Sequence, residues 1–132
     1  ETTLIANGTI EAPITIRGLE DEPGYWSGII YHSVKAQSVM NYCNVSGSGY
    51  DSSYGDACNL FLYENSRLTI TNCVFSGSQY YGIGIDRVSD MQYITHANNA
   101  FAGCQGGNVW IESGGEYNGV TYEDGQILPN LP

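Results

Sequence analysis

Four short apolar segments recur along this chain at nearly even intervals, and a second recurring segment lies between them. Steps of 31, 23 and 26 residues separate the first series, and steps of 30 and 26 separate the second. Two interleaved series with a shared period predict one structural unit repeated in space, and this period is typical of a β-solenoid. The first series is Gly28–Tyr31, Asn59–Leu62, Gly82–Ile85 and Asn108–Ile111; the second is Val45–Gly47, Phe75–Gly77 and Phe101–Gly103.

The clearest indication of a coil is an internal alignment at a constant shift of 30 residues. Segment 39–47 aligns with segment 69–77, so that Cys43 falls on Cys73 and the two Ser-Gly pairs coincide. An antiparallel sandwich would also give short alternating strands, but it gives no reason for this register. We therefore predict an all-β, right-handed parallel β-helix of about four to five coils, without evident capping helices.

Stacked coils place equivalent residues in rows. We expect two inward rows, glycine corners at which a positive φ carries no Cβ clash, and an asparagine stack at one bend. The rows are Val45, Phe75 and Phe101, and Leu60, Ile83 and Val109; the corners are Gly47, Gly77 and Gly103, and the stack is Asn72 and Asn98.

Composition restricts the partners and the compartment. The 132 residues form a single domain, and 14 acidic against 4 basic residues give a net charge of −10, which disfavours nucleic acid and anionic membranes. No stretch approaches the roughly 18 apolar residues of a transmembrane helix, so we expect no membrane insertion. Few lysines, 11 tyrosines, 17 glycines and 4 cysteines without a C-x-x-C pair favour an extracellular or cell-surface protein.

The opening of the chain resembles a known family. Leu4–Ile16 followed by Gly24–Ile29 resembles the L-x-A-x-G-T-x-x-x-P-I-x-F and G-x-W-x-G-I motifs of bacterial right-handed parallel β-helix repeat proteins, which share the pectate-lyase-like solenoid fold. These are secreted or surface proteins, many of them modular. In that family a strand precedes the equivalent of Leu4, so the resemblance implies a segment of a longer solenoid or a subunit completed by a neighbour. Residues 124–132 resemble the linker to a next module.

The ends of such a solenoid expose unpaired strand edges and need a cap. We expect other protein to cover them, either flanking modules or identical copies stacked end to end into a fibre. The leading functional prediction is therefore a non-enzymatic extracellular structural or adhesive module. The alternative is a carbohydrate-binding or polysaccharide-degrading domain, because the fold class also hosts lyases and hydrolases; an enzyme is the less favoured reading.

The cysteines are disulfide candidates. Stacked coils bring the Cα atoms of Cys43 and Cys73 within disulfide range, and we favour that pair. Cys58 and Cys104 are then either buried thiols or a second pair. A ladder of reduced, buried thiols is the competing interpretation.

Candidate chemistry is sparse, and no residue is assigned a catalytic role. Asp51 and Asp56 in the longest loop are candidate calcium ligands, calcium being the only cofactor considered. Asp86 and Asp90 around Arg87 are expected to form a local surface ion pair.

Loop tyrosines are the candidate glycan contacts, since an aromatic face suits the C–H side of a pyranose. Those in loops of adjacent coils are Tyr50, Tyr54, Tyr80 and Tyr81. Asn7 and Asn44 begin N-glycosylation sequons, and Asn44 should face outward because it alternates with inward Val45.

Overall fold

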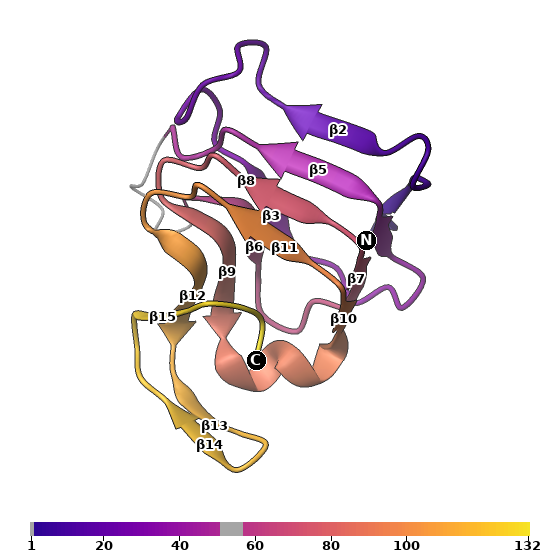
Figure 1. The fold of residues 1–132 in the computed structure, drawn as a ribbon. Helices are drawn as coiled ribbons and strands as arrows, with labels where there is room; N and C mark the ends of the chain where they lie inside the picture. Colours follow the sequence, from indigo (N-terminus) through magenta and orange to yellow (C-terminus); the bar gives the residue numbers. More distant parts are fainter. Residues whose placement is uncertain (1, 51–56) are drawn as a thin grey trace.

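The computed structural model describes residues 2–50 and 57–132, and its strands recur in sets of three separated by glycine-rich and polar bends (Figure 1). The first set is β1 (Ile5–Asn7), β2 (Ile14–Arg17) and β3 (Ile29–Tyr31), and the second is β4 (Val39–Asn41), β5 (Cys43–Ser46) and β6 (Cys58–Leu62). The third is β7 (Leu68–Thr71), β8 (Val74–Ser76) and β9 (Tyr81–Arg87), and the fourth is β10 (Ile94–Ala97), β11 (Ala100–Ala102) and β12 (Gly107–Ser113).

Equivalent strands of successive sets pair in parallel and build three sheets. The first sheet has the order β1-β4-β7-β10, the second β2-β5-β8-β11, and the third β3-β6-β9-β12 with β15 (Gln126–Leu128) added at its edge. This confirms an all-β parallel solenoid and excludes the antiparallel sandwich. From the first set of strands to the fourth the chain completes about three turns, fewer than the four to five coils predicted, because residues after β12 form a terminal structure rather than another coil.

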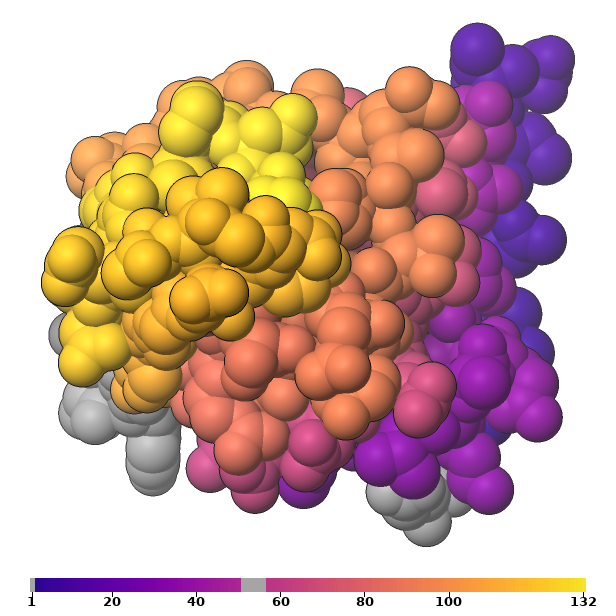
Figure 2. Space-filling view, turned by 90° about the horizontal axis from the view of Figure 1, so that it is seen from below, coloured from indigo at the N-terminus to yellow at the C-terminus, as the bar shows by residue number. Residues whose placement is uncertain are grey.

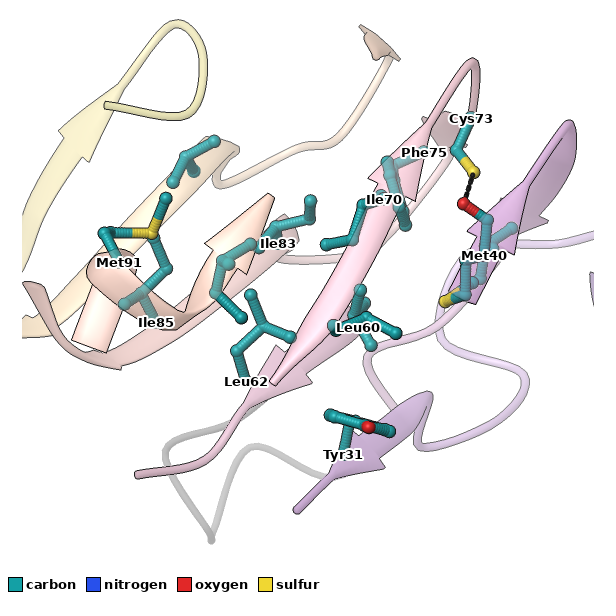
Figure 3. Packing of buried hydrophobic residues seen from close by; sticks show 14 of the residues in the cluster. Tyr31, Met40, Leu60, Leu62, Ile70, Cys73, Phe75, Ile83, Ile85 and Met91 are labelled. Atoms are coloured by element: carbon teal, nitrogen blue, oxygen red, sulfur yellow. Dashed lines mark hydrogen bonds between the residues drawn. The ribbon is translucent and has the colours of Figure 1, made fainter. Parts of the chain in front are cut away.

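The predicted inward rows are confirmed residue by residue. Val45 pairs with Phe75 and Phe75 with Phe101, whose rings stack with centroids 5.8 Å apart. In the third sheet Leu60, Ile83 and Val109 are aligned in the same way and are fully buried. Figure 3 shows Leu60, Ile83 and Phe75 among the side chains packed in the interior. Burial of such rows is the main favourable contribution to the solenoid's stability.

The predicted corners are also confirmed. Gly47, Gly77 and Gly103 have φ values of 77°, 57° and 64°, and Asn72 and Asn98 share the left-handed region at 55° and 57°. Asparagine tolerates this conformation better than most residues because its short side chain bonds locally. Here Asn72 Nδ2 donates to Asn41 Oδ1 at 3.0 Å, which ties the bend to the previous coil.

The predicted Cys43–Cys73 disulfide is wrong, since no two of the four cysteines, all within the described residues, lie at disulfide distance. In-register parallel strands hold equivalent side chains side by side at the strand spacing of roughly 4.8 Å. A disulfide needs Cβ atoms roughly 3.8 Å apart, so this parallel arrangement does not favour one. The thiols bond to backbone carbonyls instead: Cys43 Sγ donates to Ala6 O at 3.3 Å and Cys73 Sγ to Met40 O at 3.5 Å.

The C-terminal end of the solenoid is partly covered by its own chain. β13 (Gly115–Tyr117) and β14 (Val120–Tyr122) form a hairpin, and β15 runs antiparallel to β12. The 3-10 helix η1 (Val88–Tyr93) connects β9 to β10 beneath the core. In Figure 2, which looks onto this end, the yellow C-terminal segment lies over one side of it. His96 Nε2 lies 3.0 Å from Pro132 O, so residues 124–132, predicted as a linker-like tail, fold back onto the coils within this chain.

The N-terminal end is open by comparison. β1, β2 and β3 are the edge strands of their sheets, and each is paired on one side only. Several large apolar residues of this first coil are exposed: Ile5 at 69%, Ile10 at 72%, Leu19 at 83% and Ile30 at 55%. The N-terminal end of the solenoid is therefore an open strand edge, whereas the C-terminal end is partly covered by the chain itself.

Candidate functional site

The outer face of the third sheet carries a cluster of aromatic rings. Phe61 and Trp110 each follow an inward residue, Leu60 and Val109, so both point to the outer face, where Phe61 is covered by its neighbours and only 2% exposed. Tyr81 and Trp110 stack with centroids 5.2 Å apart and planes 10° from parallel, and Phe61 lies 6.5 Å from Trp110. We call this the aromatic cluster; it consists of Phe61, Tyr63, Tyr80, Tyr81 and Trp110.

Gly84 makes this arrangement sterically possible. It stands between Phe61 and Trp110 in the register of the third sheet. A Cβ at Gly84 would lie 2.6 Å from the Phe61 ring and 2.6 Å from Cys58 Sγ. The absence of a side chain on β9 thus lets rings from the two flanking strands approach each other across it.

Carboxylates flank the aromatic cluster. Leu62, Ile85 and Ile111 are aligned across three strands, so the residues that follow them, Asp86 and Glu112 among them, occupy the next outward row. Both carboxylates are half-buried. At the edge of the sheet Trp110 is paired with Ile127, which is 44% exposed. The face therefore combines rings, aliphatic surface and negative charge.

The predicted glycan tyrosines are only partly brought together. Tyr80 and Tyr81 belong to the aromatic cluster, with ring centroids 6.4 Å apart. Tyr50 is 73% exposed and donates its backbone N–H to Trp26 O. The other members of that predicted site, Tyr54 and the calcium candidates Asp51 and Asp56, lie outside the described residues.

The predicted ion pair of Arg87 is confirmed for Asp90, and its second partner is Glu64 rather than the predicted Asp86. The Arg87 guanidinium donates to both carboxylate oxygens of Asp90, at 3.0 and 3.1 Å, and lies 3.3 Å from Glu64. The hydrogen bond to Asp90 raises the pKa of Arg87 above its ordinary value. The contacts of Arg87 with Asp90 and Glu64 hold the start of η1 in place, and the three charged groups are paired with one another. Among residues 2–50 and 57–132, no three His, Cys, Asp or Glu side chains are grouped to hold a metal.

The sequons stand on the surface. Asn44 is exposed between buried Cys43 and Val45, as predicted. Asn7 is exposed too, and its Oδ1 accepts a hydrogen bond from Asn41 Nδ2 at 2.9 Å. Asn7 and Asn44 thus remain accessible candidates for modification.

A second surface feature lies at the N-terminal end. A groove of about 310 Å³ runs between residues 2–4 and the edge strand β3, and its lining includes exposed Ile30 and His32. The backbone of β3 is paired only with β6, on the side away from this groove.

Compared with known proteins, the chain matches no family model, no curated protein and no solved structure. Within the part of the chain that the structure describes, no helix has the length and apolar character needed to span a membrane.

Sequence reasoning missed the central residues of the aromatic cluster. The apolar strand pattern includes Phe61 and Trp110 but assigns them no surface role, and the predicted glycan contacts are the loop tyrosines. The available signal was their position: each stands between two inward aliphatic residues, so strand alternation places both rings on the outer face.

Proposed function

We propose that this protein is a non-enzymatic structural or adhesive β-solenoid module of an extracellular or surface protein, joined to other protein through its N-terminal end. The observation that carries the proposal is the open first coil, in which three strand edges and several large apolar side chains are uncovered together. Unpaired strand edges are templates for pairing with further strands.

The chemistry of this end fits a further β-layer. Leu4, Ile14, Ile16 and Ile29 are only half-buried, although each packs against the core. Their counterparts one coil later, such as Val45 and Leu60, are completely buried. One more layer of strands would complete the burial of the first coil in the same way that each coil covers the one before it.

Flanking protein suits this joint better than an end-to-end stack of identical copies. In such a stack, β3 of one copy would have to pair with β15 of the next, which runs antiparallel to the rest of the third sheet. The C-terminal tail that contacts His96 would also lie between the two copies. The resemblance of the first coil to modular bacterial β-helix repeat proteins supports the same reading.

The test measures exposure and self-association of the intact 132-residue chain. We expect a dye that binds exposed apolar surface to respond strongly, and the mass from light scattering to rise with concentration as exposed N-terminal ends associate with one another. Ile5→Lys combined with Ile30→Lys should abolish both effects, while the control Val120→Lys, on the far hairpin, should change neither.

A strictly monomeric chain that binds no dye, at all concentrations, would overturn the proposed joint. Equal suppression by Val120→Lys would overturn its location at the N-terminal end.

A further inference from the structure

We propose that the open side of β3 binds an extended peptide strand of another polypeptide, in parallel, and that this strand carries alternating aliphatic side chains and no acidic ones. The inference rests on the proposed function, because it names the kind of segment that joins the N-terminal end and the strand edge that receives it. Three features carry it: the direction of the backbone groups of β3, the groove beside them and the charge of the first coil.

The backbone groups that face the open side belong to Ile30. Tyr31 O accepts a hydrogen bond from Tyr63 N at 2.9 Å, so the backbone of Tyr31 is turned toward the second coil. Successive residues of a strand direct their N–H and C=O groups to opposite sides, so those of Ile30 point away from β6. Ile30 thus offers one donor and one acceptor to an added strand, which is how each residue of a parallel pair is engaged.

A groove lies along this open side. Its volume is about 310 Å³, and it runs between residues 2–4 and residues 29–33. Ser33 Oγ donates to Thr2 O at 2.8 Å, and Val39 N donates to Leu4 O at 2.8 Å. Both walls are therefore tied to the solenoid by hydrogen bonds. A strand can enter a groove that is already formed, so binding costs less ordering of the protein.

The register of the third sheet predicts the side-chain pattern of the bound strand. Ile30 lies beside Phe61 on the outer face, and Ile29 lies beside Leu60 on the inner face. Phe61 is 2% exposed and Leu60 is fully buried, whereas Ile30, at the edge, is 55% exposed and Ile29 is only half-buried. A strand with aliphatic inward residues would bury Ile29 and Ile30 as β3 itself helps to bury β6.

The charge restricts the strand further. The lining of the groove contains no Asp, Glu, Lys or Arg side chain. The first coil around it is acidic, and the whole chain carries a net charge of −10. This field favours a neutral or basic segment and disfavours an acidic one. The charged residues of the first coil are Glu11, Arg17, Glu20, Asp21 and Glu22.

The experiment titrates the intact chain, at a concentration at which it is monomeric, with the capped octapeptide KTVTVTVK. Calorimetry measures binding, and NMR measures hydrogen exchange of the Ile30 amide. We expect saturable binding and at least tenfold slower exchange of that amide. The matched control is the same peptide with N-methylated valines. Its side chains are unchanged, but it lacks the donors that would face Ile30 when the valines point inward, and it should not bind.

A variant of the chain isolates the same hydrogen bond. Ile30→Pro removes only the N–H on the open side, and proline is tolerated there because β3 is an edge strand. It should weaken peptide binding at least tenfold while the response to the apolar-surface dye persists, whereas Ile30→Val should bind as the parent does. Circular dichroism establishes that each variant is folded; if Ile30→Pro is not, the N-methylated peptide provides the same test on the parent chain.

No saturable peptide binding, by a chain that still binds dye and self-associates through its N-terminal end, would overturn strand addition at β3 and leave the proposed joint intact. Equal binding of the N-methylated peptide would overturn the backbone pairing. Equal binding of the acidic analogue ETVTVTVE would overturn the assigned charge of the partner.

Discussion

The Cys73 thiol lies within hydrogen-bond distance of two backbone carbonyl oxygens, Met40 O at 3.5 Å in the previous coil (Figure 3) and Thr71 O at 3.2 Å in its own coil. Cys43 makes the equivalent bond to Ala6 O at 3.3 Å. The two thiols thus repeat one contact at successive levels of the solenoid. They act as small apolar side chains with a weak donor that contacts carbonyl oxygens of the same coil and of the previous coil, with no covalent bond between them.

The first prediction concerns thiol reactivity. Burial raises the pKa of the Cys73 thiol to about 11, and burial also raises the pKa of Cys43. Because the thiolate is the reactive form, both groups should resist Ellman's reagent in the native protein at pH 8. In denaturant all four cysteines should react, and mass spectrometry of the untreated protein should find no disulfide. A Cys43–Cys73 cross-linked peptide would contradict the structure.

The second prediction follows from the same pKa. Above pH 9 the unfolded chain loses the Cys73 proton, while the native protein retains it until pH approaches about 11. The native state then binds more protons, so the free energy of unfolding should fall as pH rises from 9 to 11, by at most about 1.4 kcal/mol per pH unit from this group. Urea unfolding of the parent and of Cys73→Ala measures it, and the variant should show a shallower decline. Parallel declines would contradict the assignment.

A third prediction concerns a buried amide between two sheets. Asn59 Oδ1 accepts from Ser48 N at 3.2 Å, and Nδ2 donates to Ser76 O at 3.0 Å, with Asn59 fully buried. Asn59→Ala leaves the buried Ser48 N–H without its acceptor, whereas Ser76 O keeps its hydrogen bond from Gly47 N at 3.2 Å. The free energy of unfolding should fall by about 1–3 kcal/mol.

The matched control is Asn108→Ala. Asn108 makes a single exposed hydrogen bond, to Pro129 O, so its removal should cost less than about 1 kcal/mol. Similar losses in the two variants, measured by urea unfolding, would contradict the role assigned to Asn59.

Much of the fold could be predicted because, in a solenoid, the spacing between repeated sequence segments equals the pairing register of the strands. The 30-residue shift that aligned Cys43 with Cys73 is the pairing register of the strands around them, as in Asn41 with Thr71 and Asn44 with Val74. The other inward pairs follow the same repeat with shifts that vary with loop length, such as 23 residues from Leu60 to Ile83 and 26 from Ile83 to Val109. Local periodicity and global topology coincide here because every coil rests on the one before it.

The end structures and the outer face could not be predicted in this way. Residues after β12 belong to no repeat, so nothing in the period indicated that β15 turns back against the third sheet. The approach of Phe61 to Trp110 depends on Gly84, whose significance emerges only once three strands are aligned. The disulfide prediction is wrong because close Cα atoms do not suffice for a disulfide, which also needs the two Cβ atoms closer than in-register parallel strands hold them.

The last prediction separates two costs of placing a side chain on glycine. Gly28 has a φ of 98°, and a Cβ there would lie 1.9 Å from Cys58 O, in the backbone of the next coil. Gly77 has a φ of 57°, and a Cβ there meets nothing within 4 Å. Gly77→Ala should therefore cost only the left-handed conformation, about 1–2 kcal/mol. Gly28→Ala adds a backbone clash that no rotamer can relieve, and it should cost about 3 kcal/mol or more. Thermal and urea unfolding of both variants provides the comparison; equal losses would mean that β3 does not approach β6 as closely as the register of the third sheet requires.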